Sequence, residues 1–198
     1  MKRLGILAGA ASGVAAMGLV IGGALPSNAA PLKTVAASNT QSVTYVKRYF
    51  NHSNLGYQAT AVLPKTWRLV VLGQDQARFT DPTANRMIRF DTTYNYKIST
   101  ATALKNKIAA LKGTRGLHIV GTSTVTMRST TGQGPLTAST LVYTYKSGNT
   151  TRWVATRYVG LWGTKSALTE ISTAGALSDS KLLGAVINNA TVSLTLAG

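Results

Sequence analysis

The stretch RFTDPTANRMIRFD, residues 78–91, decides how this chain folds. It contains two of the five acidic residues, Asp81 and Asp91. An Asp before Pro favours the start of a type I turn, because the carboxylate accepts a backbone N–H ahead of it and Pro82 presets φ. After the turn, apolar and polar residues alternate, as in a strand with one buried face. The stretch therefore predicts a β-hairpin with Asp81 in its turn.

The alternation after this turn also assigns faces. Ile88 and Phe90 share one face of the expected strand, while Met87, Arg89 and Asp91 share the other. Asp91 is then an outward carboxylate beside Arg89, ten residues from Asp81 along a chain that reverses direction. The two aspartates are therefore not expected to act as a catalytic pair.

Outward from the hairpin, β-branched and aromatic runs separated by short turns predict an antiparallel meander. Strands are expected at residues 57–64, 67–73, 117–128, 136–146 and 152–162, with further extended segments at 166–173 and 191–196. Helices are expected at 99–113, capped by Ser99 or Thr100, and at 178–190, capped by Ser178. The fold class is α+β, an antiparallel β-sheet with flanking helices.

The N-terminus reads as a secretory signal peptide. Lys2 and Arg3 precede an uncharged run rich in Ala, Gly and Leu, and small residues predict cleavage after Ala29. Retention of this run as a membrane anchor is the alternative. We expect a signal peptide at 1–29, a linker and short pre-domain element at 30–54, and one domain at 55–198, without a membrane span after cleavage.

Composition limits the chemistry. The chain has no cysteine, which excludes disulfides, a thiol nucleophile and a lipid-modified N-terminal cysteine. The formal charge is +16, and removing Lys2 and Arg3 leaves 19 − 5 = +14. A field of this size attracts anionic polymers, lipid headgroups or nucleic acid, unless it serves solubility alone.

The order of these elements resembles the Mog/PsbP-like α/β/α sandwich family over roughly residues 55–196. The resemblance is carried by Pro64 with Trp67, the Phe79-Thr80-Asp81-Pro82 turn, the 99–113 helix, the 117–162 strands and the 178–190 helix. Among the branches of this family, the chain is most similar to exported actinobacterial LpqN/LpqT-type proteins. Many bacterial members are lipoproteins, and the lack of cysteine departs from that pattern.

The resemblance implies a binding or assembly factor without an established active site. It does not specify a ligand, because one fold hosts many functions. The expected partner is an envelope component of unknown identity: an anionic polymer, a lipid or a protein.

Few residues of the types that form catalytic sites are present, with five acidic residues, two histidines and no cysteine. A metal site is not expected, since the only histidines are His52 and His118, and no cofactor is expected either. No G-x-S-x-G elbow or phosphate-binding loop is present. A secreted hydrolase with an Asp/Glu acid–base remains the alternative function, and nonspecific nucleic-acid binding is another. The carboxylates of such a hydrolase would come from Asp75, Asp81, Asp91, Glu170 and Asp179.

Cations interleaved with aromatic residues give the sharpest functional hint. Such residues suit stacking and contact with anions. Arg152 and Arg157 differ in parity and should point to opposite faces of their strand. The predicted ligand-binding residues are Arg89, Tyr143, Tyr145, Lys146, Arg152, Trp153 and Arg157. We therefore expect a secreted, non-catalytic binding protein, extracellular or associated with the cell wall.

Overall fold

The computed structural model describes residues 43–52, 58–93 and 97–197, which belong to one compact unit spanning Gln41–Gly198. The predicted signal peptide and its cleavage after Ala29 lie outside the described residues. Among the helices of the described ranges, none has the length and apolar character needed to cross a membrane.

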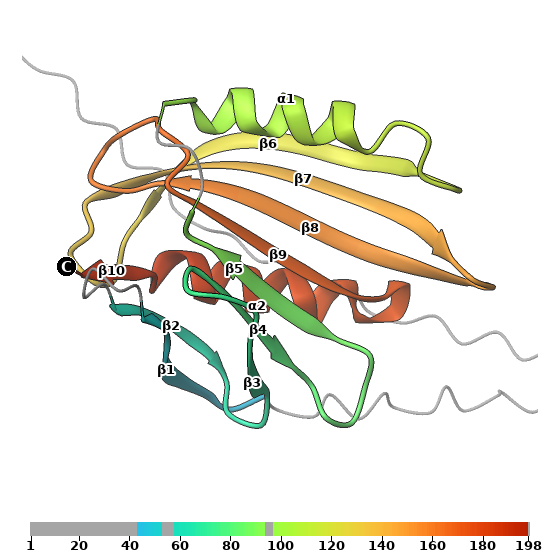
Figure 1. The fold of residues 1–198 in the computed structure, drawn as a ribbon, viewed down its shortest axis with the longest axis horizontal. Coiled ribbons are helices and arrows are strands. Elements are labelled where there is room, and N and C mark those ends of the chain that lie inside the picture. The colour runs from blue at the N-terminus through green and yellow to red at the C-terminus, as the bar shows by residue number, and fades with distance from the viewer. Residues whose placement is uncertain (1–42, 53–57, 94–96, 198) are drawn as a thin grey trace, which may run out of the picture. The chain divides into compact units, whose positions relative to one another are not determined.

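Antiparallel pairing organises the described strands into two sheets (Figure 1). The larger has the order β3-β4-β5-β9-β8-β7-β6, and the smaller has the order β1-β2-β10. The strands are β1 (Tyr45–His52), β2 (Gln58–Pro64), β3 (Arg68–Val71), β4 (Gln76–Thr80), β5 (Met87–Asp91), β6 (His118–Arg128), β7 (Pro135–Ser147), β8 (Thr150–Gly160), β9 (Thr169–Ala176) and β10 (Thr195–Ala197). The expected α+β class with an antiparallel sheet and flanking helices is confirmed.

Helix α2 (Ser180–Val192) lies between the two sheets, packing on β8 and β9 of the larger and on β2 of the smaller (Figure 1). Its buried side chains Leu183, Val186, Ile187 and Ala190 are at most 1% exposed. They join the main core together with aromatic residues of β1, β4 and β5. Burial on both sides explains why this helix is apolar over much of its surface.

Helix α1 (Thr100–Ala110) covers part of the opposite face of the large sheet, over β7 and β8 (Figure 1). The Ser99 side chain accepts the backbone N–H of Thr102, so the predicted cap is confirmed. Leu104 is buried in a second core cluster, against which Ile108 and Leu111 pack. Each face of the large sheet therefore carries one helix.

The helix ends differ from the prediction. Helix α1 stops at Ala110 rather than at 113, because Leu111 forms its C-cap. Ser178 does not cap α2, since it lies in a 3₁₀ turn, η1 (Leu177–Asp179). Helix α2 begins directly after that turn, at Ser180. The Asp179 carboxylate instead accepts the backbone N–H of Ala176, which closes the turn.

The first strand comes from the segment assigned above to the linker and pre-domain element. Strand β1 pairs antiparallel with β2. Its Phe50 is 3% exposed, with a ring centroid 4.2 Å from that of Phe90. Strand β1 therefore belongs to the same compact unit as the strands that follow it.

The β4–β5 hairpin has the predicted turn. The Asp81 carboxylate accepts the backbone N–H of Thr83 at 2.9 Å and the Thr83 hydroxyl at 2.8 Å, and it pairs with Arg86 Nε at 3.1 Å. Burial alone would raise the pKa of Asp81. The Thr83 bonds, the Arg86 charge and a bond from the Trp67 side chain outweigh burial and lower that pKa.

The two aspartates of the opening stretch lie at opposite ends of this hairpin. Asp81 closes the turn, whereas Asp91 pairs in register with Gln76 at the other end. Ile88 and Phe90 are fully buried in the main core, as the alternation predicts. Asp91 is bonded to Arg89, so each aspartate has its own cationic partner.

Replacing either of two glycines by alanine tests the packing, and the two variants should change stability in opposite directions. A methyl group at Gly160 would lie 2.8 Å from the Ser166 carbonyl oxygen and closer still to that of Thr164, whereas a methyl group at Gly184 meets no atom within 4 Å. We expect Gly160→Ala to lower the free energy of unfolding by about 1–3 kcal/mol. The matched control Gly184→Ala, within α2, should raise it by about 0.5–1 kcal/mol. Urea denaturation measures both, and equal effects of the two variants would contradict the packing.

The Asp81 turn predicts a pH dependence. A carboxylate whose pKa is lowered on folding stabilises the fold above its unfolded pKa, near 3.8, and this stabilisation is lost as pH falls through the folded pKa. Asp81→Asn should lower the free energy of unfolding by about 1–2 kcal/mol at neutral pH. The difference from the parent should shrink below the unfolded pKa.

Denaturation by urea from pH 7 down to acid measures this difference. The control is Asp75→Asn, because Asp75 contributes its backbone carbonyl, rather than its carboxylate, to the bonds with Thr92. A difference between Asp81→Asn and the parent that stays constant with pH would rule out this role for the carboxylate.

Candidate anion-binding site

Strands β3, β4 and β5 present polar side chains on the same side of the large sheet as α1. Because α1 packs on β7 and β8, these side chains stay partly exposed. We call this surface the open face. Its members are Arg68, Gln76, Arg78, Thr80, Met87, Arg89, Asp91 and, from β8, Arg152.

Cations outnumber carboxylates on and beside the open face. Its four arginines and Lys107 of α1 face two carboxylates, those of Asp91 and of Glu170 on β9. Asp91 pairs with Arg89 at 3.1 Å and Glu170 with Lys107 at 3.4 Å. The balance is 5 − 2 = +3, and the other three arginines have no carboxylate partner within the described ranges.

Arg89 is held in place by its neighbours. Its Nη2 donates to the Asp91 carboxylate at 3.1 Å and to Gln76 Oε1 at 2.9 Å. Gln76 in turn donates to Asp91 at 3.0 Å. This closed set of three bonds uses one nitrogen of the guanidinium, and it orients the group without burying it, since the side chain is 34% exposed.

Arg78 lies directly opposite Arg89 in the β4–β5 register. Residues so placed have Cβ atoms about 4.5–5.5 Å apart, and like charges there destabilise a sheet. The Nε atom of Arg78 is buried and has no hydrogen-bond partner in the described structure. A buried donor without an acceptor costs about 1–3 kcal/mol. This pair therefore combines facing like charges with a buried donor that lacks an acceptor among the described residues.

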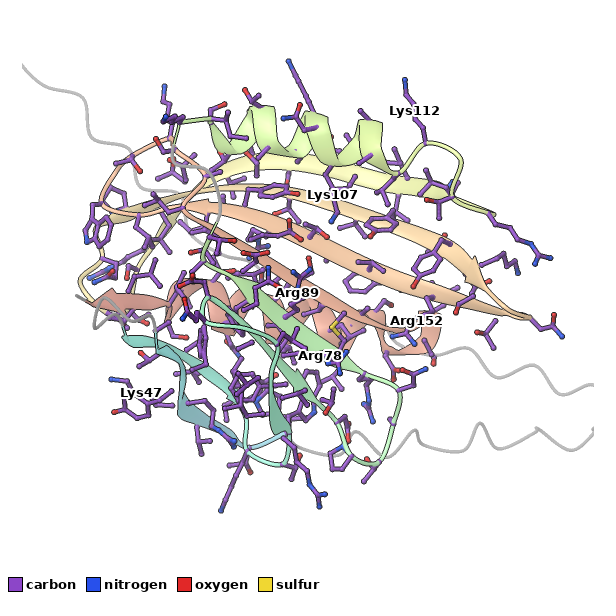
Figure 2. The ribbon with its side chains drawn as sticks, in the orientation of Figure 1. Lys47, Arg78, Arg89, Lys107, Lys112 and Arg152 are labelled. Atoms are coloured by element: carbon purple, nitrogen blue, oxygen red, sulfur yellow. The ribbon has the colours of Figure 1, made fainter. Side chains whose placement is uncertain are left out.

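Two further cations come from other elements, Arg152 within the open face and Lys107 beside it. Figure 2 shows the labelled side chains of Arg78 and Arg89 on β4 and β5, Arg152 on β8 and Lys107 on α1. Arg152 Nη2 donates to the backbone carbonyl of Asn85, next to the hairpin turn, at 3.2 Å. Its remaining charge is not balanced by an acid among the described residues.

The predicted binding residues divide between the two faces of the sheet. Arg89, Arg152, Tyr143 and Tyr145 lie on the α1 side. Tyr143 is only 7% exposed, and burial is the main cause that raises its pKa. Tyr145 and Glu170 also raise this pKa, whereas a hydrogen bond with the Thr156 side chain lowers it. The two tyrosines pack against the second core cluster beneath α1, so of these four only the arginines belong to the open face.

The other three predicted residues lie on the α2 side. Trp153 is 8% exposed and belongs to the main core. Lys146 donates to the Thr151 hydroxyl on the adjacent strand at 2.9 Å. Arg152 and Arg157 point to opposite faces, as the strand period predicts. The seven residues therefore do not form a single surface.

Arg157 is engaged inside the protein. It donates to the hydroxyls of Thr140 at 2.8 Å and Thr191 at 3.0 Å, and to Asn188 Oδ1 at 3.0 Å. Desolvation lowers the pKa of Arg157 to about 10, so the group remains charged at neutral pH. Its bonds tie β7 and β8 to α2, which is a structural task.

Four of the five carboxylates considered for acid–base chemistry carry structural bonds. Glu170 is 8% exposed and accepts from Lys107 and, at 3.0 Å, from Ser172. Asp179 pairs with Arg86 at 3.7 Å. A hollow of about 440 Å³ lies where β6 and β7 meet, around Met127 and Pro135, and no carboxylate lines it.

The described ranges offer few metal ligands. His118 is exposed at the start of β6, and the His52 side chain lies outside the described part of the structure. Within the described residues, no group of three or more His, Cys, Asp or Glu could hold a metal ion.

Sequence reasoning missed Arg68, Arg78 and Lys107 as members of this site. The signal for Arg78 was present, because it alternates with buried Ala77 and Phe79 as Arg89 does with its neighbours. Extending the pairing of the hairpin from the Asp81 turn places Arg78 opposite Arg89. Lys107 required the placement of α1, which no local pattern supplies.

Comparison with solved structures identifies the fold. LpqN of Mycobacterium tuberculosis, described as involved in cell envelope biogenesis, superposes with a TM-score of 0.51 at 16% identity, covering 78% of this chain and 92% of LpqN. The Ran-binding protein Mog1p of Saccharomyces cerevisiae gives 0.53 at 11% identity, covering 78% and 96%. No family model and no curated protein matches the sequence. The chain has a Mog/PsbP-like α/β/α sandwich fold, near that of LpqN.

Proposed function

We propose that this protein is a non-catalytic binding protein of the cell envelope or the extracellular space, and that it holds an anionic partner on the open face. The observation that carries this proposal is a set of three arginines on one partly exposed sheet face that have no carboxylate partner among the described residues. A surface with a local charge of +3 favours an anion over a neutral or cationic partner.

Binding rather than catalysis is favoured by the state of the acids. Four of the five carboxylates accept hydrogen bonds or ion pairs from their own neighbours. A hydrolytic acid–base pair needs two carboxylates facing one cleft with separated pKa values. The bonds of Asp81 and Asp179 instead belong to turns, and those of Asp91 and Glu170 neutralise adjacent cations.

The location rests on two separate supports. The N-terminal run has the pattern of a secretory signal. LpqN, which shares the fold, is described as involved in cell envelope biogenesis. Anionic polymers exposed at the cell envelope would then be within reach of the open face. Mog1p, which also shares the fold, binds a protein, and an acidic protein would present the same charge to this face.

A polyanion measures this function directly. Binding to a fluorescent polyphosphate chain should weaken steeply with salt, because each cation that contacts the polymer releases a counterion. Combining Arg68→Gln, Arg78→Gln and Arg152→Gln should reduce the slope of log K against log salt by about two units if all three contact the polymer. The matched control combines Lys47→Gln, Lys112→Gln and Lys181→Gln, which removes three exposed charges elsewhere.

The control decides where binding occurs. Equal losses in the two triple variants would mean that net charge, rather than the open face, binds the polymer. An absence of binding at low salt would end the charge-driven function.

A further inference from the structure

We propose that Arg78 and Arg89 together form a site for a single phosphate group, which bridges their guanidinium groups. This inference rests on the proposed function, since it uses the same open face. It differs in concerning one compact anion held by two named side chains rather than a polymer held by net charge.

The first support is the position of the two arginines. They face each other across β4 and β5, where like charges raise the energy of the sheet. Asp91 neutralises one of the two charges through its bond to Arg89. Two cations and one carboxylate leave a local charge of +1, and an anion placed between the guanidinium groups would remove the repulsion.

The second support is the unused hydrogen-bonding capacity. The Nε atom of Arg78 is a buried donor without an acceptor in the described structure. Both bonds of Arg89 to described residues come from one terminal nitrogen, Nη2, so within the described ranges its other donors have no acceptor. Natural structures rarely leave such a donor buried without a partner, and the exceptions call for an explanation such as a missing ion.

The chemistry of the two groups favours phosphate over carboxylate. A guanidinium presents a planar fork of donors that pairs with two oxygens at once. A carboxylate carries one negative charge on two oxygens, so two such forks would have to share the same oxygen atoms. A phosphate group has more oxygens and up to two negative charges, so it can accept from both arginines.

The neighbours of the pair are compatible with a bound anion. Ser172 of β9 lies opposite Arg89, and its hydroxyl is engaged with Glu170 and Thr156. Gln76 and Asp91 hold Arg89 in place before any ligand arrives. A pre-oriented guanidinium loses less conformational freedom on binding, which strengthens the contact.

Thermal unfolding of the purified protein tests the site. Sodium phosphate at millimolar concentration should raise Tm by several degrees relative to sodium chloride at equal ionic strength. Arg78→Gln and Arg89→Gln should each abolish this shift. In phosphate-free buffer, Arg78→Gln should have a higher Tm than the parent, because it removes the unbalanced charge and the buried donor. A purely structural role for Arg78 would instead lower Tm.

Matched variants and ligands sharpen the test. Lys112→Gln and Lys47→Gln, exposed and distant in Figure 2, should keep the full phosphate shift. Arg78→Lys keeps the charge but loses the fork, and it should weaken the shift while folding normally. The natural ligand could carry its phosphate as a diester or as a monoester, and two probes distinguish them. A larger rise in Tm with dimethyl phosphate assigns a phosphodiester, whereas a larger rise with inorganic phosphate assigns a phosphomonoester.

The inference is overturned if Arg78→Gln retains the phosphate shift, or if sodium acetate produces the same shift as phosphate at equal concentration. These outcomes are independent of the polymer experiment. If the parent protein shows the phosphate-induced rise in Tm but does not bind polyphosphate at low salt, the proposed function alone is contradicted. If it binds polyphosphate but shows no phosphate-induced rise in Tm, this inference alone is contradicted.

Discussion

The burial of α2 between the two sheets is the constraint on which the rest of the structure depends. Its apolar side chains meet β8 and β9 on one side and β2 on the other, and they form the centre of the main core. Without this helix, the inner faces of both sheets would lose their cover. A sheet face that lacks a partner exposes its apolar side chains to water, which costs free energy in proportion to the area exposed.

This packing assigns the two faces of the large sheet different tasks. The α2 side is filled by core side chains, and the buried cation Arg157 on that side donates to three acceptors. On the other side, α1 is short and covers β7 and β8. The strands beyond its reach carry arginines because their side chains remain in contact with water. Function is therefore expected where the helix layer ends.

Local patterns predicted much of this fold because short-range physics governs them. The Asp81 turn, the Ser99 cap and the alternation of Ile88 with Arg89 each depend on neighbours within a few residues. The start of α2 was misplaced, because Asp179 closes a turn with Ala176 ahead of the helix. Whether this segment forms a 3₁₀ turn or the first turn of α2 depends on the direction in which the chain leaves β9.

The sequence by itself determined the strand and helix types, the hairpin and its faces, the absence of cysteine and the large positive charge. The pairing of Arg78 with Arg89 follows from the register of the hairpin. Only the tertiary structure decided which further cations lie near them, since Arg152 and Lys107 come from elements far along the chain. Composition and period do not encode strand order. Strand order follows from how the sheets and helices cover one another's apolar faces, which is a property of the whole chain.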